Sequence, residues 1–268
     1  MSVGTELLDL RVTDSGDDVH YIHLVNLRLW PDTDTGVSLR APDRSEPGRV
    51  SRGRVHLLPS AGMRLLGPDQ ETLLASSTGG WFGLSAKTWM FRFQARPAMQ
   101  FYGLGEKHMP FERSGRAYWF WNTDAWADHP HGLVRDGDYD PDYLSVPYLI
   151  VKQDNTYVGL LVDSPYPAMI AAGAPFSSLD GLEPSPETGR EILLAAVGGP
   201  PSLVVIVGPS LAELTRKFQQ VVGVTPLPPL WSLGYHQSRW GYRGAADLTG
   251  LADRFERHRF PADGLFLD

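Results

Sequence analysis

Residues 1–208 of this chain show almost no helical periodicity, and this feature limits the fold more than any other. Residues 18–30 instead alternate apolar and polar side chains, which places Val19, Tyr21 and His23 on one face. Alternation with a period of two is typical of β-strands. The chain also carries 28 glycines and 22 prolines, which punctuate short strands and turns rather than long helices. The region is therefore predicted to be mainly β.

A β-hairpin is predicted near the middle of the chain. Residues 148–151 and 157–163 are apolar runs, and the polar residues 152–156 separate them. Three more segments have strand patterns: residues 88–95, 191–197 and 202–207. Several short strands in series predict an antiparallel β-sandwich, and we assign residues 1–208 to this N-terminal domain.

The pattern changes to a helical period after residue 208. Ser210 is followed three residues later by Glu213, which is a capping-box pattern. Apolar residues then recur at helical spacing, and Gly223 supplies a stop signal. The proline-rich residues 225–229 are stiff and extended. Residues 209–228 are therefore predicted to be a linking helix and a connection.

The last segment, residues 229–268, reads as one strand–helix–strand unit. Apolar strands are predicted over residues 230–235 and 264–267, with an amphipathic helix over residues 245–259 between them. Pro261 ends the helix. Two strands joined by a helix predict a parallel pair, as in an α/β fold.

Composition excludes several classes of function. The formal net charge of -7 argues against nucleic acid or an anionic membrane as the main partner. No apolar run has membrane-spanning length, and Glu6 and Asp9 stand where a signal peptide would be basic and then apolar, so we expect a cytoplasmic protein. The absence of cysteine excludes disulfides and thiolate metal ligands.

Residues 120–126, FWNTDAW, form an unusual loop in which three aromatic side chains flank the turn-forming residues Asn122, Thr123 and Asp124. Aromatic residues make up 11% of the chain and gather between residues 102 and 148. Such rings stack on sugars, or they fill the core of a sandwich. Asp124 is accordingly either a ligand-binding carboxylate or the side chain of an Asx-turn.

Two further candidates follow the predicted parallel strands. Trp240 lies in the loop after the first strand, and Asp268 follows the second. In a parallel α/β barrel, functional residues collect at the C-terminal ends of the strands. A carboxylate there can accept hydrogen bonds from sugar hydroxyls, and an indole can stack on a sugar ring. The alternative for Asp268 is a helix N-cap or a solvated loop residue.

Four motifs together give the chain a resemblance to glycoside hydrolase family 31, the α-glucosidase family. They are FYGLGEKH at residues 101–108, WNTDAW at 121–126, PPLWSLGYHQSRWGYRG at 228–244 and PADGLFLD at 261–268. They occur in the order found in that family, and the combination is specific although each motif alone is weak. The resemblance implies a galactose-mutarotase-like β-sandwich followed by the start of a (β/α)8 catalytic barrel over residues 229–268.

The resemblance also implies a role for each candidate residue. Asp124 matches a sandwich residue that reaches the barrel mouth and hydrogen-bonds the sugar. Asp268 matches the barrel aspartate that binds the non-reducing-end sugar, and Trp240 matches an aromatic wall of the same pocket. His236 and Arg239 contact the sugar or hold the loop in place. No metal and no cofactor are implied.

The family reaction is retaining hydrolysis of an α-glycosidic bond, which needs a nucleophilic carboxylate and an acid/base carboxylic acid about 5 Å apart. By resemblance both are aspartates on barrel strands beyond the second. We therefore expect no catalytic residue in this chain, and no activity of the chain alone. The intact enzyme is expected to be an α-glucosidase or α-xylosidase acting on oligosaccharides or simple α-glycosides, and a homo-oligomer is compatible with this expectation.

Two other functions are compatible with a β-sandwich. One is a non-catalytic carbohydrate-binding module, and the other is a mutarotase-like aldose epimerase. The epimerase needs a His and Glu pair, for which His108 with Glu106 or Glu112 is a poor candidate by spacing. The strand–helix–strand unit after Pro229 favours the hydrolase, since a separate binding module has no use for it.

Overall fold

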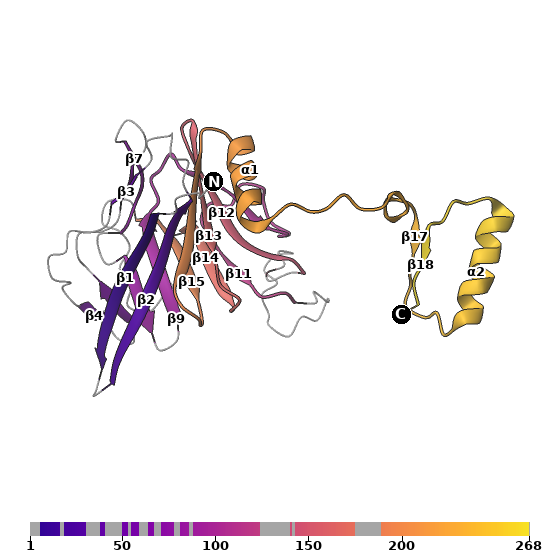
Figure 1. Cartoon of the computed structure of the whole chain (residues 1–268), viewed down its shortest axis with the longest axis horizontal. Coiled ribbons are helices and arrows are strands. Elements are labelled where there is room, and N and C mark those ends of the chain that lie inside the picture. The colour runs from indigo at the N-terminus through magenta and orange to yellow at the C-terminus, as the bar shows by residue number, and fades with distance from the viewer. Residues whose placement is uncertain are drawn as a thin grey trace. The chain divides into compact units, whose positions relative to one another are not determined.

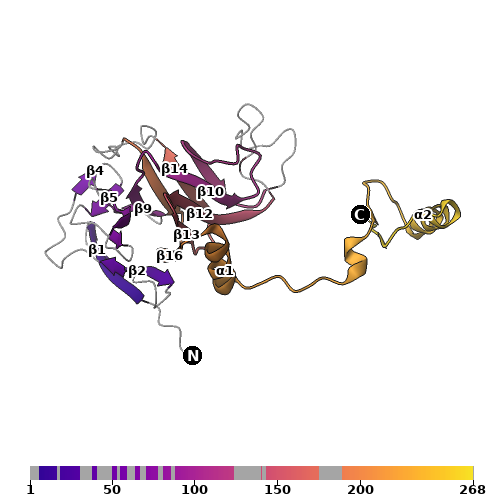
Figure 2. The same ribbon diagram turned by 90° about the horizontal axis from the view of Figure 1, so that it is seen from above.

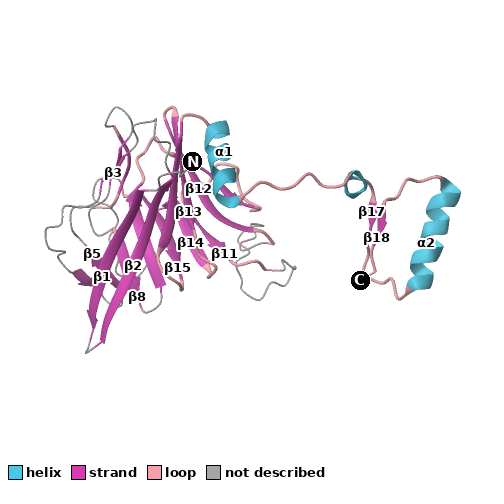
Figure 3. Cartoon of the chain, in the orientation of Figure 1, coloured by secondary structure: helices cyan, strands magenta, loops and turns pink. Residues whose placement is uncertain are grey.

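The computed structural model describes twelve stretches of the chain: residues 6–16, 19–30, 38–40, 50–52, 55–58, 64–66, 71–77, 81–85, 88–123, 140, 143–174 and 189–267. The chain forms two compact units, Met1–Val221 and Val222–Asp268 (Figure 1). The first unit consists mostly of strands, and the second contains an α-helix, a 3-10 helix and a short pair of strands (Figure 3).

A six-stranded sheet forms one layer of the first unit. Its strands in spatial order are β1 (Glu6–Gly16), β2 (Val19–Trp30), β16 (Ser202–Gly208), β13 (Thr156–Val162), β12 (Ser145–Gln153) and β10 (Gln100–Gly105). All neighbours are antiparallel except β16 and β2, which are parallel. The predicted hairpin over residues 148–163 is confirmed, because Gln153 pairs with Thr156 across a two-residue turn at which Asp154 has a φ of 50°.

A seven-stranded antiparallel sheet forms the other layer, and Figure 2 shows the strands from above. Its strands in spatial order are β11 (Arg116–Phe120), β14 (Ala168–Ala174), β15 (Glu191–Ala196), β9 (Thr88–Gln94), β8 (Phe82–Ser85), β5 (Val55–Leu58) and β4 (Val50–Arg52). A small third sheet contains β3 (Ser38–Arg40), β6 (Arg64–Leu66) and β7 (Thr72–Ala75). Because β15 and β16 belong to different sheets, the chain crosses between the layers at residues 197–201.

The core lies between the two large sheets. Phe91 and Phe93 of β9 are fully buried and belong to one cluster with Leu149 of β12 and Val205 of β16. Every second side chain of these strands points into this cluster, as the alternating pattern predicts. The expected antiparallel β-sandwich is therefore confirmed for this unit.

The seven-stranded sheet also carries a buried ion pair on the face opposite this core. Nε and Nη2 of Arg92 in β9 lie 2.8 and 2.7 Å from Oε2 of Glu191 in β15. The Ser77 hydroxyl donates to Oε1 of the same carboxylate at 2.8 Å. The side chains are 1% and 0% exposed, so each charge depends on the other for its stabilisation.

Helix α1 (Leu211–Val222) follows β16 and packs on the outer face of the six-stranded sheet. Leu214 is fully buried there, and Phe218 stacks on Tyr148 with ring centroids 4.1 Å apart. The predicted N-cap is present, since the amide of Glu213 donates to Oγ of Ser210 at 3.2 Å. Gly223 has a φ of 90°, which ends the helix as its sequence position predicts.

The second unit contains the predicted strand–helix–strand arrangement. Strand β17 (His236–Gln237) runs parallel to β18 (Gly264–Leu265), and α2 (Ala245–His258) connects them. Helix α2 ends one residue earlier than predicted, because Arg259 adopts a left-handed conformation with a φ of 53°. Its amide donates to the Glu256 carbonyl, and the amide of Phe260 donates to the Phe255 carbonyl.

The predicted strand over residues 230–235 is wrong. Leu230–Leu233 forms a 3-10 helix, and pairing with β18 begins only at Tyr235. The hydroxyl and the amide of Ser232 both donate to the Pro229 carbonyl, at 2.7 and 3.0 Å. These local bonds close a turn, and none of the described strands pairs with residues 230–233, so the apolar character of the segment does not make it extended.

None of the helices described here has the length and apolar character needed to cross a membrane.

Candidate functional site

The FWNTDAW loop begins where β11 ends. Phe120 is buried at 3% exposure, whereas the next aromatic side chain, Trp121, is 57% exposed. The predicted sugar contact Asp124 and the third aromatic, Trp126, lie outside the described residues. The structure therefore shows how the start of this loop is held.

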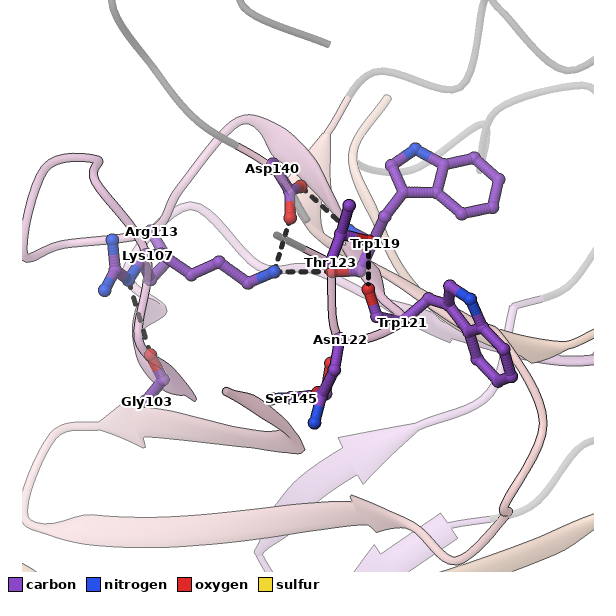
Figure 4. A network of polar contacts seen from close by, with 9 residues as sticks. All are labelled: Gly103, Lys107, Arg113, Trp119, Trp121, Asn122, Thr123, Asp140 and Ser145. Carbon is purple, nitrogen blue, oxygen red and sulfur yellow. Dashed lines mark hydrogen bonds and ion pairs between the residues drawn. The ribbon is translucent and has the colours of Figure 1, made fainter. Parts of the chain in front are cut away.

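A buried lysine and aspartate anchor the loop (Figure 4). Nζ of Lys107 donates to Oδ1 of Asp140 and to the carbonyl of Trp119, and it lies 4.6 Å from the centre of the Phe120 ring. Oδ2 of Asp140 accepts the amide of Trp119 at 2.8 Å. The two charged side chains are 1% and 6% exposed. Because Asp140 lies beyond residues 124–139 in sequence, this pair ties the far side of the loop back to β11.

A second hydrogen bond joins a residue that precedes residues 124–139 to one that follows them. Oδ1 of Asn122 accepts the backbone amide of Ser145, the first residue of β12, at 2.9 Å. The hydroxyl of Thr123 donates to the carbonyl of Trp121 at 2.7 Å, which fixes the turn (Figure 4). Asn122 thus serves the loop as an anchor, which agrees with the turn-forming role that its residue type indicates.

The Gly-Leu-Gly motif upstream is a β-bulge within β10 rather than a simple turn. Gly103, Leu104 and Gly105 all have φ between 70° and 87°, and the pairing with β12 shifts register there. A Cβ on Gly103 would lie 2.6 Å from the carbonyl oxygen of Tyr148, so only glycine fits. The bulge leads the chain directly into Lys107.

Arg113 organises the residues between the bulge and β11. Its Nη1 donates to the carbonyl of Pro110 at 2.8 Å and to that of Met109 at 3.1 Å, and its Nε reaches the Gly103 carbonyl at 3.4 Å. The hydroxyl of Tyr118 donates to the carbonyl of Arg113 at 3.0 Å. The segment before the FWNTDAW loop is therefore fixed by charge-assisted bonds to backbone oxygens.

Glu112, one of the two carboxylates considered for an epimerase, has a structural role here. Oε1 of Glu112 accepts the amide of Phe101 at 2.8 Å and the hydroxyl of Ser114 at 2.7 Å, while Oε2 accepts the Ser114 amide at 3.1 Å. Burial acts to raise the pKa of Glu112, but these hydrogen bonds and the charge of Arg190 outweigh it and lower the pKa below its ordinary value. A carboxylate held ionised by backbone amides is a poor proton donor.

In the second unit, the described candidate is Trp240. Its side chain is 88% exposed and lies at a turn in which Gly241 has a φ of 121°. The guanidinium carbon of Arg239 lies 5.9 Å from the Tyr242 ring centre. Asp268 lies outside the described residues. An indole this exposed is free to stack on a ligand, as its predicted role requires.

His236 holds the turn that precedes Trp240. Its Nε2 lies 3.2 Å from the carbonyl oxygen of Trp231, and its ring lies between those of Trp231 and Phe266 at centroid distances of 5.8 and 5.7 Å. These contacts favour the second of the two roles predicted for His236, that of holding the loop.

Sequence reasoning missed Lys107 and Asp140. Asp140 belongs to the run Asp136-Gly-Asp-Tyr-Asp140, which has the composition of a solvated loop, and its partner lies 33 residues away. No local signal distinguishes a buried lysine from an exposed one. In the part of the chain that the structure describes, no cluster of three or more His, Asp or Glu residues is arranged to hold a metal ion.

Two family models match the chain, one in each unit. The model described as "Glycosyl hydrolase 31 N-terminal galactose mutarotase-like domain" matches residues 66–170. The model described as "Glycosyl hydrolases family 31 TIM-barrel domain" matches residues 225–268. The matches occur in the same order as the sandwich and the strand–helix–strand unit.

Curated relatives include α-glucosidases from bacteria and mammals. The chain is 30% identical over 171 residues to Alpha-glucosidase 2 of Bacillus thermoamyloliquefaciens, covering 64% of this chain and 19% of the relative. It is 40% identical over 91 residues to Neutral alpha-glucosidase AB of Mus musculus, covering 34% of this chain and 10% of the relative. The chain thus spans about a fifth or less of the length of these relatives.

Solved structures share the fold at low sequence identity. A dextranase of Flavobacterium johnsoniae, solved with isomaltotriose and with glucose, aligns with a TM-score of 0.60 at 20% identity over 85% of this chain and 26% of that one. A cycloalternan-degrading enzyme from Trueperella pyogenes aligns with a TM-score of 0.52 at 16% identity, over 81% of this chain and 25% of that one.

Proposed function

We propose, from the premise that this chain belongs to glycoside hydrolase family 31, that it forms the sugar-binding sandwich and barrel entrance of a retaining α-glycosidase. The substrate class is an oligosaccharide or a simple α-glucoside or α-xyloside. The reaction is hydrolysis of an O-glycosyl bond, and it requires no cofactor.

The proposal rests on one observation, which is that two domain types of the same family follow each other in this chain. A mutarotase-like sandwich is followed by a parallel strand–helix–strand unit, and each matches its own model of the same family. A separate sugar-binding module would need only the sandwich. Of the two carboxylates considered for an epimerase, Glu106 and Glu112, the second is occupied by Phe101 and Ser114.

Three residues are proposed to contact the sugar. Trp240 would form an aromatic wall, and its 88% exposure leaves the indole available for stacking. Asp124 and Asp268 would accept hydrogen bonds from sugar hydroxyls. The contacts of Lys107, Asp140 and Asn122 support the role of Asp124, since they hold the start of its loop in one arrangement.

The nucleophile and the acid/base are proposed to come from barrel strands other than the two in residues 225–268. A retaining mechanism needs two carboxyl groups about 5–5.5 Å apart across the scissile bond. The role of this chain is then to position the sugar, and the chain by itself should not hydrolyse aryl α-glucosides or maltose.

The test is a chimera in which the barrel of Alpha-glucosidase 2 of Bacillus thermoamyloliquefaciens continues this chain after residue 268. The chimera should hydrolyse an aryl α-glycoside, and Asp124→Asn should lower its kcat/KM by roughly tenfold to a hundredfold. The expected loss corresponds to one charge-assisted hydrogen bond, about 1.5–3 kcal/mol. The Tm should stay nearly unchanged.

Asp128→Asn is the matched control, because it removes the same charge four residues later in the loop. It should leave kcat/KM unchanged. If Asp124→Asn and Asp128→Asn behave alike, Asp124 is a turn residue rather than a sugar contact. A folded chimera without activity on α-glucosides and α-xylosides would contradict the hydrolase assignment itself.

The cytoplasmic location and the formation of a homo-oligomer stay predictions of the sequence. Fractionation of the producing cells and sedimentation of the purified protein would test them.

A further inference from the structure

A pocket opens on the sandwich beside the start of the FWNTDAW loop. It has a volume of about 420 Å³, and its walls come from the end of β11, the start of β12 and the connection between β13 and β14. All the described residues that line it belong to the sandwich, and Trp240 is not among them. The volume lies within the range of about 300–1,000 Å³ that small-molecule sites occupy.

One wall of the pocket is a tyrosine held against glycines. Cβ atoms on Gly198 and Gly199 would lie 2.6 and 3.0 Å from the ring of Tyr166, so the ring rests directly on this backbone turn. The turn is itself fixed, because Nε1 of the buried Trp89 donates to the carbonyl of Gly198 at 3.0 Å. The ring is nevertheless 48% exposed. Tyr166 is thus an aromatic surface whose position is set before any ligand binds.

The other aromatic wall is Trp121. The indole is 57% exposed, while the backbone around it is held by the Thr123 hydroxyl on its carbonyl and by the bond from Ser145 to Asn122. Figure 4 shows the Trp121 side chain extending away from this hydrogen-bond network. Exposed aromatic rings on a fixed backbone lose little conformational entropy when they bind.

The described residues that line the pocket carry no charged side chain. Asn122 and Ser164 contribute an amide and a hydroxyl group, and Tyr166 and Trp121 carry a phenol hydroxyl and an indole N–H. The Ser145 hydroxyl is buried, and the remaining described lining residues are apolar. Among these described residues, a phosphate or a carboxylate would find no cation, and a cationic ligand would find no carboxylate. A neutral pyranose matches the lining, since its C–H faces stack on aromatic rings and its hydroxyls pair with amides and hydroxyls.

We propose that this pocket binds one pyranose unit of a neutral oligosaccharide, as a second sugar site that belongs to the sandwich alone. The site does not rest on the proposed hydrolase activity. It would hold a sugar through residues of the sandwich, whether or not a catalytic barrel acts on another part of the same oligosaccharide.

Isothermal titration calorimetry of the 268-residue chain with isomaltose and with maltose tests the proposal. We expect saturable binding of at least one of them, and Tyr166→Ala and Trp121→Ala should each raise the Kd by about tenfold or more. Tyr166→Phe keeps the ring and should bind nearly as the parent does. Inorganic phosphate should not compete.

Two variants serve as controls. Trp119→Ala removes an indole that is 41% exposed but does not line the pocket, and it should not change the Kd. Trp240→Ala is measured beside it, because Trp240 is the sugar contact proposed for the second unit. Binding that Trp240→Ala abolishes and Tyr166→Ala does not would overturn the pocket and support the barrel-rim contact instead. Absence of saturable binding with both sugars would overturn it as well.

Discussion

The β-sandwich and the second unit differ in burial far more than in local structure. Both contain an amphipathic helix, α1 and α2, and both contain regular strands. The sandwich encloses a cluster of fully buried apolar side chains drawn from both sheets. In residues 222–267, by contrast, no side chain is buried. More than half of the large apolar side chains that are exposed among the described residues lie in this segment.

The difference shows which property of a fold is local and which is not. Helix α2 and the two-residue pairing of β17 with β18 form from sequence signals within 40 residues. A core needs further layers, because each element can cover only one face of its neighbour. The second unit therefore has the topology of a parallel α/β fold without the burial that stabilises one.

The largest expected consequence concerns proteolysis. A nonspecific protease should cut residues 223–229 or 237–244, which are exposed or half-exposed, and leave a resistant fragment containing the sandwich. Opening a sandwich costs about 5 kcal/mol or more, so its own cleavage should be at least about a thousandfold slower. Mass spectrometry of timed digests measures both rates. If the protease cuts both units at the same rate, the second unit is as stable as the sandwich and the proposed difference is wrong.

Breaking the buried ion pair should destabilise the sandwich by about 3–5 kcal/mol. Arg92→Met leaves the Glu191 carboxylate buried without its counter-charge, although the Ser77 hydrogen bond remains. Chemical denaturation measures the free energy of unfolding. The double variant Arg92→Met with Glu191→Met should recover much of the loss, and Arg254→Met on the exposed face of α2 should change stability by less than about 0.5 kcal/mol.

The same substitution in the two helices should sharpen the comparison further. Leu214 of α1 is fully buried against the six-stranded sheet, so Leu214→Ala should cost about 2–4 kcal/mol. Leu251 of α2 is only half-buried, so Leu251→Ala should cost less than about 1 kcal/mol in local helix stability. Hydrogen exchange can report each helix separately. Comparable losses at the two positions would show that α2 has a core of its own.

Sequence patterns predicted the elements well where the signals are local. The alternation in residues 88–95, the cap at Ser210 and the strand–helix–strand order all correspond to observed structure. The strand predicted over residues 230–235 failed because apolar character alone does not supply a pairing partner. Its local bonds to Pro229 favoured a 3-10 turn instead.

Sequence patterns could not predict contacts between distant residues. Arg92 meets Glu191 across 99 residues, and Lys107 meets Asp140 across 33, so neither pair has a periodicity to reveal it. The parallel pairing of β16 with β2 is equally nonlocal. Of the three predicted sugar contacts, only Trp240 lies among the described residues, and the pocket beside Tyr166 combines segments that no motif connects.

The smallest expected effects come from two buried tyrosines of the sandwich. The Tyr118 hydroxyl donates to the Arg113 carbonyl. Tyr148 is 5% exposed, and its hydroxyl has no hydrogen-bond partner among the described residues. At neutral pH, Tyr118→Phe should cost about 1 kcal/mol, because it leaves a carbonyl without its donor. Tyr148→Phe should be neutral or slightly stabilising, because it removes an unpaired buried hydroxyl. In the second unit, Tyr235→Phe is the control, since this ring is 50% exposed.

Both tyrosines should also make the free energy of unfolding depend on pH in the alkaline range. Burial raises the pKa of Tyr118 from 10.0 to about 12, against the opposing charges of Arg113 and Arg116, and burial also raises the pKa of Tyr148. Below pH 10 both phenols are neutral in the folded and unfolded chains, so their contribution to stability is fully present. Above pH 10 the unfolded chain ionises first, and the free energy of unfolding falls as the pH approaches the raised pKa values. Denaturation curves between pH 9 and about pH 12 should show this fall, and Tyr148→Phe should reduce its slope. An unchanged slope in Tyr148→Phe would mean that the hydroxyl reaches solvent, and that the packing of α1 over Tyr148 is looser than its contact with Phe218 indicates.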